Sequence, residues 1–128
     1  MERRILKEGS AFEETAAYSR GVRAGDLVVI SGTAALEDGV ALYPGDIYRQ
    51  TQAAIEKALG AAAELGATPQ DVIRTRLLLA PRSDWHAAIR AHEEAFRGID
   101  PANTTWFVGG FVPPGVLVEI ELDAMVGS

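Results

Sequence analysis

The sequence predicts an α+β domain in which two amphipathic helices cover one face of a mixed β-sheet. Short runs of alternating or β-branched apolar residues near both ends of the chain predict strands. Two longer segments between them repeat apolar residues at helical spacing. The expected order is β-β-β-α-β-α-β-β, and helices that each bury one face usually pack on one side of a sheet. The other side must then face water or another subunit.

Six segments carry strand patterns and are separated by turn signals. The expected strands cover residues 4–7, 18–23, 27–30, 71–80, 103–112 and 116–126. Gly25-Asp26 and Glu37-Asp38-Gly39 are expected to form tight turns, and the polar segment 9–15 is expected to be a loop. Pro113-Pro114-Gly115 has the chemistry of a turn, because proline fixes φ and glycine permits positive φ.

Two helices are expected, the first over residues 46–66 and the second over residues 83–96. Alanine is frequent on the apolar face of the first helix, which predicts close packing on the sheet. Gly66 is placed to end this helix, and Ser83 can cap the second one. The expected inner face of the second helix comprises Trp85, Ala88, Ile89, His92 and Phe96.

The composition is that of one globular domain spanning residues 1–128, with 48% hydrophobic and 23% charged residues. The chain has no cysteine, which excludes disulfide scaffolds, cysteine–zinc sites and thiol catalysis. A net charge of −6 argues against nucleic acid or an anionic membrane as a general partner. Residues 1–4 lead into no apolar signal segment, and no apolar run approaches the ~20 residues of a membrane span, so a cytoplasmic location is expected.

Several common kinds of site lack their sequence signals. His86 and His92 are expected on different faces of the second helix, so no shared metal site is predicted. His92 lies near the apolar stripe and is expected to be packed and hydrogen-bonded. Ser31 has no neighbouring acid–base partner and no nucleophile elbow, which argues against a serine hydrolase. The chain also has no phosphate-binding loop.

Three acidic side chains share one face of the last expected strand, because side chains alternate along a strand. They are Glu119, Glu121 and Asp123. Adjacent carboxylates repel and need partners, and Arg74 and Arg76 share a face of the central strand from which they can provide them. A solvated strand face is the simplest interpretation of the three residues, and Glu121 and Asp123 are interpreted as structural.

The turn at residues 113–115 predicts a hairpin between the last two strands. Paired residues would then have numbers that sum to roughly 228. Glu119 would face Gly109, and Asn103 would lie on the order of 20 Å away along the strand. One small ligand could not touch both side chains within a chain. A site that uses both must be shared by two subunits. Gly109-Gly110 would either leave room for the neighbour or form a simple β-bulge.

Segments spread along nearly the whole chain resemble, in order and spacing, the Rid family (YjgF, reactive-intermediate deaminase, or RidA-like). Ala17-Tyr18-Ser19-Arg20-Gly21 and Val29-Ile30-Ser31-Gly32-Thr33 resemble its N-terminal motifs. Residues 52–59 and 65–72 resemble its first helix and the strand that follows. The segments that resemble its C-terminal signature are Pro101-Ala102-Asn103-Thr104-Thr105 and Leu117-Val118-Glu119-Ile120-Glu121.

The resemblance implies a chorismate-mutase-like fold of the bacillus type, assembled as a homotrimer with small-molecule sites between subunits. Characterised deaminases of this family hydrolyse 2-imino and enamino acids to 2-oxo acids and ammonia without a cofactor. By resemblance, Glu119 positions the attacking water, and Tyr18 and Ser31 line the site. Asn103 and Thr105 are expected to bind substrate from the neighbouring chain.

Two positions depart from the family pattern. The arginine that holds the substrate carboxylate is Asn103 here, and the glutamine after Ser-Gly is Thr33. An arginine offers a carboxylate a charged, bidentate fork, whereas asparagine offers a neutral amide. Hydrolysis of 2-iminobutanoate or 2-iminopropanoate is therefore expected to be weak or absent.

Three functions remain open from the sequence. The first is an imine or enamine deaminase with Glu119 as the general base or water-positioning group. The second is a protein that binds a small carboxylate or carbonyl compound, or regulates, without catalysis, and Asn103 favours it. The third is chorismate-mutase-like chemistry on a dicarboxylate. Candidate arginines for that substrate are Arg20, Arg74, Arg76 and Arg82.

Overall fold

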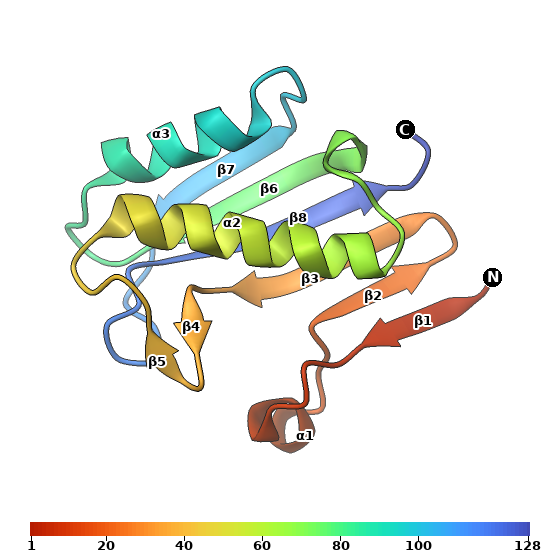
Figure 1. The fold of residues 1–128 in the computed structure, drawn as a ribbon, viewed down its shortest axis with the longest axis horizontal. Coiled ribbons are helices and arrows are strands. Elements are labelled where there is room, and N and C mark those ends of the chain that lie inside the picture. Colours follow the sequence, from red (N-terminus) through yellow and green to blue (C-terminus); the bar gives the residue numbers. More distant parts are fainter.

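The computed structural model describes residues 1–128 and contains a six-stranded sheet with strand order β1-β2-β3-β8-β6-β7 (Figure 1). β6 and β7 run parallel and the other neighbouring strands run antiparallel, so the sheet is mixed as predicted. The strands are β1 (Arg3–Leu6), β2 (Gly21–Ala24), β3 (Leu27–Thr33), β6 (Val72–Leu79), β7 (Ala102–Phe107) and β8 (Val118–Met125).

The two predicted helices are α2 (Ile47–Glu64) and α3 (Trp85–Phe96), and both lie on the same face of the sheet (Figure 1). This arrangement confirms the predicted α+β class. No helix is both long enough and apolar enough to cross a membrane. The shorter elements are α1 (Ala11–Ala16), β4 (Leu36–Glu37), β5 (Val40–Ala41) and a 3-10 turn at Pro69–Asp71.

The first residues of α3 differ from the prediction. Asp84, not Ser83, caps this helix, because the Asp84 carboxylate accepts a hydrogen bond from the N–H of Ala87. The Ser83 hydroxyl instead donates to the Ala80 carbonyl at 2.8 Å. Both serine and aspartate can cap a helix, and the aspartate one residue after the predicted cap takes this role.

Helix α1 forms where a polar loop was predicted. The Ser10 hydroxyl accepts from the N–H of Glu13, and the Glu13 carboxylate accepts in return from the N–H of Ser10. This reciprocal pair is a capping box, which satisfies backbone donors that a short helix would otherwise leave free. Ala17 ends the helix in the left-handed conformation, with φ of 57°, and β2 begins at Gly21 rather than at Tyr18.

The core lies between β8 and the alanine-rich face of α2. The fully buried side chains of this layer are Val118, Ile120, Leu122, Ala124, Ala54 and Ala58. Small alanine side chains let the helix approach the sheet closely, as the sequence predicted. The alternate residues of β8, Glu119, Glu121 and Asp123, are partly exposed on the opposite face.

Arg76 is the predicted partner of the acidic row. Its Nη1 lies 3.6 Å from Glu121 Oε1 and 3.5 Å from Asp123 Oδ2. Arg74 forms no ion pair of this kind. One arginine on β6 therefore serves the two carboxylates that were interpreted as structural.

The predicted hairpin between the last two strands is wrong. β6 lies between β7 and β8, so Leu78 of β6 pairs with Trp106 on one side and with Glu119 on the other. The chain makes a β-α-β crossover through α3, which places β7 parallel to β6. The connection to β8 must then pass to the other edge of β6. Accordingly, β7 ends at Phe107 instead of continuing to Val112.

The corrected topology still separates Asn103 from Glu119. Asn103 pairs with Thr75 and Glu119 pairs with Leu78, so the two residues are two strands apart and three positions apart along β6. At ~4.8 Å per strand and ~3.3 Å per residue, their backbones are about 14 Å apart.

Enlarging an alanine in the core layer should destabilise the fold. Ala58 is fully buried, so Ala58→Leu should lower the free energy of unfolding by about 1–3 kcal/mol through overpacking. Ala63 is exposed on the same helix, and Ala63→Leu should leave stability nearly unchanged. Urea unfolding measures both variants, and equal stabilities would contradict this account of the core.

Candidate active site

A cavity of about 840 Å³ opens beside the last residues of β3, next to α1 and the β4–β5 hairpin. Tyr18, Ser31 and Glu119 all line it, as do Arg20 and Gly32. These residues come from three separate parts of the chain, and the sheet brings them together. The volume lies in the range that binds small organic ligands, ~300–1,000 Å³.

An irregularity in β3 shapes the floor of this cavity. Ile30 pairs with Leu122 and Thr33 pairs with Ile120, so Ser31 and Gly32 together oppose one residue of β8. This is a β-bulge, which takes an extra residue out of the regular pairing and bends the strand. The strand was predicted to stop at Ile30, and it instead continues through the bulge.

Glu119 lies directly over Gly32. A Cβ atom on Gly32 would come within 2.5 Å of Glu119 Oε1, closer than real side chains tolerate. The lack of a side chain at Gly32 allows this close approach of the carboxylate, and no positive φ is involved. Gly32 makes room for Glu119 at the floor of the cavity.

The surroundings of Glu119 favour its uncharged form. Burial raises the pKa of the Glu119 carboxyl, and the nearby negative charge of Glu121 raises it further. The positive charge of Arg20 acts in the opposite direction and only partly offsets burial. A carboxyl whose pKa moves toward neutrality can both accept and return a proton, as a general acid–base group must.

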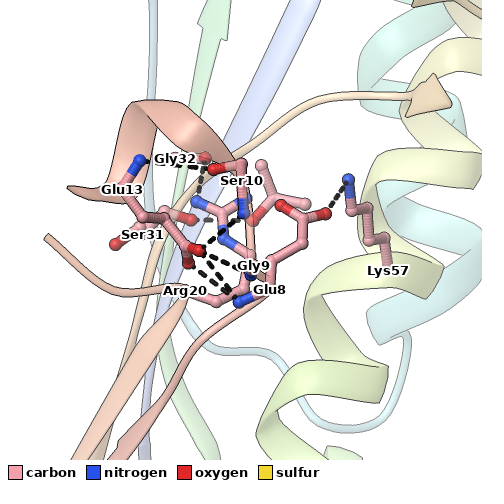
Figure 2. Close-up of polar contacts among 9 residues, drawn as sticks. Glu8, Gly9, Ser10, Glu13, Arg20, Ser31, Gly32 and Lys57 are labelled. Atoms are coloured by element: carbon pink, nitrogen blue, oxygen red, sulfur yellow. Dashed lines mark hydrogen bonds and ion pairs between the residues drawn. The ribbon is translucent and has the colours of Figure 1, made fainter. Parts of the chain in front are cut away.

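Arg20 is the site residue that sequence reasoning missed for imine chemistry. Its side chain is only 9% exposed, and its Nη2 donates to the Gly32 carbonyl at 2.8 Å (Figure 2). Its Nε is buried without any hydrogen-bond partner. The sequence showed Arg20 between Ser19 and Gly21 in a recognised motif, but gave no sign that its side chain would be buried.

Ser31 and Tyr18 present polar atoms to the same cavity. The Ser31 hydroxyl donates to the Ser19 carbonyl at 2.6 Å, so its oxygen remains free to accept a hydrogen bond from a ligand. The Tyr18 ring is held edge-on to Phe12, with centroids 6.4 Å apart, and its hydroxyl has no protein partner. Both residues can therefore still bind a ligand.

The loop at the rim of the cavity is held by charged groups (Figure 2). The Glu13 carboxylate accepts from the backbone N–H groups of Glu8, Gly9 and Ser10. These bonds, led by that of Glu8, hold the pKa of Glu13 below its usual value. Glu8 in turn pairs with Lys57 of α2 at 3.0 Å, which ties the loop to the helix layer.

Asn103 and Thr105 lie outside the cavity of their own chain. Asn103 Nδ2 donates to Thr75 Oγ1 at 3.1 Å, and the Thr105 hydroxyl donates to Asn103 Oδ1 at 2.9 Å. Their strand register with β6 places both side chains on the helix side of the sheet, whereas Glu119 is on the opposite side. One chain therefore brings together Tyr18, Ser31 and Glu119, but not the remaining two candidates.

The histidines form no metal site. His92 Nε2 lies 2.7 Å from the Thr75 hydroxyl and its ring packs on Phe96, as predicted for a packed, hydrogen-bonded side chain. His86 stacks on Trp85. No group of three or more histidine, aspartate or glutamate side chains is placed to hold a metal ion.

Known proteins resemble this chain over almost its full length. The profile of the family described as Endoribonuclease L-PSP matches residues 8–126. An uncharacterized protein of Streptomyces coelicolor is 40% identical over 125 residues, which are 98% of this chain and 93% of that protein. The mouse protein named 2-iminobutanoate/2-iminopropanoate deaminase is 26% identical, with 98% of this chain and 93% of that protein covered.

A solved structure shows the same fold. Rv2704 of Mycobacterium tuberculosis, a member of the YjgF/YER057c/UK114 family, is 39% identical and superimposes with a TM-score of 0.87 over 98% of this chain and 100% of that one. The sheet, the paired helices and the cavity thus define a small α+β protein of the YjgF type. The chain belongs to the YjgF/RidA family, as its motifs indicated.

Gly32→Ala should displace the Glu119 carboxyl while leaving the fold intact, because the added Cβ would occupy the place of Oε1. The displaced carboxyl should gain solvent, and its pKa should fall toward the usual value. A ¹³C NMR titration of the Glu119 carboxyl measures this. Gly60→Ala is the matched control, because a Cβ at Gly60 meets nothing within 4 Å. An unchanged titration in Gly32→Ala would contradict the close contact.

Glu119→Gln should stabilise the fold more at high pH than at low pH. Because the pKa is raised in the folded state, stability falls as pH rises from the unfolded pKa through the folded one. Glutamine keeps the shape without the charge, so its advantage should be smallest near pH ~4 and largest near pH ~8. Urea unfolding of both proteins across this range measures the difference, and a difference independent of pH would contradict the assigned burial.

Proposed function

We propose that this chain is a cofactor-independent deaminase that hydrolyses small imines or enamines, with Glu119 as the group that positions and activates water. The observation that carries the proposal is the Glu119 carboxyl, half-buried in a cavity with its pKa raised toward neutrality. The name of the mouse relative, an imine deaminase, supports the same reaction class.

The cavity residues can carry out each step of such a hydrolysis. Glu119 accepts one proton of water as the oxygen adds to the C=N carbon, and it returns this proton to the nitrogen to give a carbinolamine. The hydroxyl proton of the carbinolamine then passes by way of Glu119 to the nitrogen as the C=O bond forms and the C–N bond breaks. The products are a carbonyl compound and ammonia. Tyr18 and Ser31 have hydroxyl oxygens that can bind the substrate during the addition.

A homotrimer of the chorismate-mutase-like type is part of the proposal, with residues 1–128 as its single domain. The face of the sheet opposite the helices carries exposed apolar side chains, including Val29 and Trp106. Burying such a face against other subunits is the usual way to remove it from water. Asn103 and Thr105 lie on the edge strand β7 with their side chains on the helix side, so in this assembly they would reach the cavity of the neighbouring chain around that edge.

The ammonia-release assay tests the reaction. Freshly generated neutral and anionic imines are supplied to wild type and to Glu119→Gln, and ammonia is measured. We expect release by wild type with at least one imine and a fall of about 100-fold or more in Glu119→Gln, because the variant cannot accept a proton. Equal rates in the two proteins would refute the role of Glu119.

The imines of 2-oxo acids should be poor substrates. Losing a charged contact to a carboxylate typically costs about 2–5 kcal/mol, or a rate factor of roughly 30 to several thousand. Asn103→Arg should therefore raise the rate with 2-iminobutanoate, while the rate with a neutral imine stays the same. Catalysis by wild type at the rates of arginine-containing relatives would contradict this expectation.

Sedimentation tests the assembly. We expect a particle of three times the 13.6 kDa chain mass at micromolar concentration. Trp106→Asp should weaken this assembly by placing a charge on the proposed interface. Val40→Asp changes an exposed apolar residue of the β4–β5 hairpin and should leave the assembly intact. A wild-type monomer would refute the trimer.

A binding or regulatory protein without catalysis is the second candidate, and the contacts of Asn103 favour it. The side-chain amide of Asn103 is already engaged by Thr75 and Thr105, so it is not free to replace the missing arginine. The absence of ammonia release with all imines, together with ligand binding, would establish this alternative.

A further inference from the structure

We infer that Arg20 is the anion-binding residue of the cavity and takes the carboxylate of a small ligand on the same subunit that carries Glu119. The inference rests on the proposed function only in assuming that this cavity binds a small molecule. It assigns the positive charge that binds the ligand to Arg20, the residue directly before β2, rather than to position 103, where the family resemblance places it.

Arg20 is a buried charge without a counter-ion. It is 9% exposed, and it forms no ion pair with any carboxylate. Its one hydrogen bond, from Nη2, goes to the neutral carbonyl of Gly32. Buried charges are normally paired, because removing an isolated charge from water is unfavourable by several kcal/mol. A group from outside the chain can therefore provide the pairing that Arg20 lacks.

Two of the three partly buried arginines show a contrast, and the third, Arg74, is less buried than Arg20 and likewise forms no ion pair. Arg76 pairs with two carboxylates on the sheet. Arg23 donates to two backbone carbonyls, at 2.9 Å each, and pairs with Asp26. Arg20 is more buried than either and has fewer partners. Its Nε is buried with none at all, and Nη1 forms no hydrogen bond.

Glu119 does not neutralise Arg20, although both line the cavity. The two side chains form no ion pair, because no nitrogen of Arg20 lies within 4.0 Å of a Glu119 oxygen. The surroundings of Glu119 also favour its uncharged form. The cavity therefore holds a guanidinium without an ion pair beside the Glu119 carboxyl. The other charged groups that line it are the Glu8–Lys57 pair, Asp38 and Glu121.

A carboxylate is the ligand group that fits these donors. It is a planar anion that accepts two hydrogen bonds from a guanidinium. The hydroxyls of Tyr18 and Ser31 lie on the same cavity and can bind further polar atoms of the ligand. Asn103 offers no charge and has its amide engaged within the chain.

The place of the anion follows from the position of Arg20. A carboxylate held there lies on the same subunit as Glu119, whereas one held at position 103 would be reached from a neighbouring chain. The rest of the ligand would consequently extend from the carboxylate in a different direction than in a site whose arginine is at position 103. An anion held by Arg20 is thus compatible with the expectation that the imines of 2-oxo acids are poor substrates.

Binding measurements on the intact assembly test the inference separately from catalysis. Calorimetric titration with propanoate and 2-oxobutanoate, and with neutral propanamide, is carried out on wild type, Arg20→Gln and Arg20→Lys. We expect both anions to bind wild type more tightly than the amide. Arg20→Gln should weaken both anions by about 10- to 100-fold, the range expected for a charged hydrogen bond, and should not affect the amide. Arg20→Lys should retain part of the affinity.

Arg23→Gln is the matched control. It removes the same charge from β2, together with hydrogen bonds to backbone carbonyls, but it lies outside the cavity. Its affinity for both anions should equal that of wild type. If Arg20→Gln does not fold, NMR signals of the wild-type Arg20 guanidinium decide the matter, because they should shift on addition of propanoate.

Several results would overturn the inference. These are unchanged affinity in Arg20→Gln, equal affinity of wild type for propanoate and propanamide, no binding of either anion at millimolar concentration, or guanidinium signals that do not respond. Failure of the proposed deaminase looks different. Anion binding that depends on Arg20, without release of ammonia from any imine, would refute the deaminase and leave Arg20 as the anion-binding residue.

Discussion

The alternation of side chains along β8 is the constraint on which the rest of the structure depends. Every second residue from Val118 to Ala124 is buried beneath α2, and the residues between them are acidic. A shift of one position in register would place three carboxylates under an alanine-rich helix. Burial therefore determines the register of β8 against both β3 and β6, and with it the position of Glu119 at the cavity.

The sequence predicted the elements better than their arrangement. The helices and most strands follow from local periodicity, which the structure keeps. The neighbour of β7 depends instead on the crossover through α3, and a turn signal at residues 113–115 could not reveal it. Helix α1 was missed for a related reason: six residues make a marginal helix, and this one depends on the Ser10–Glu13 capping contacts.

The candidate site likewise combines residues that the sequence identified with contacts that it could not reveal. Tyr18, Ser31 and Glu119 were named through family motifs, and the structure brings them to one cavity. Strand alternation alone indicated only that Glu119 and its acidic neighbours share a face. The burial of Arg20 could not be predicted, because it depends on contacts between the residues before β2, the bulge in β3 and β8, which are far apart in the sequence. The close approach of Glu119 to Gly32 could not be predicted for the same reason.

The bulge in β3 has a consequence for how this fold can acquire different chemistries. In a regular antiparallel ladder the peptide groups of successive residues bond alternately to the two neighbouring strands. The Ser31 N–H bonds to the Arg20 carbonyl on one side, so the groups of Gly32 would be committed to β8. Here two residues oppose one, and the carbonyl of Gly32 is available to Arg20 instead. The regular half of β3, from Leu27 to Ile30, keeps its pairing with β8. Substitutions around the irregular half can alter which ligands the cavity accepts while the paired half goes on holding the sheet together.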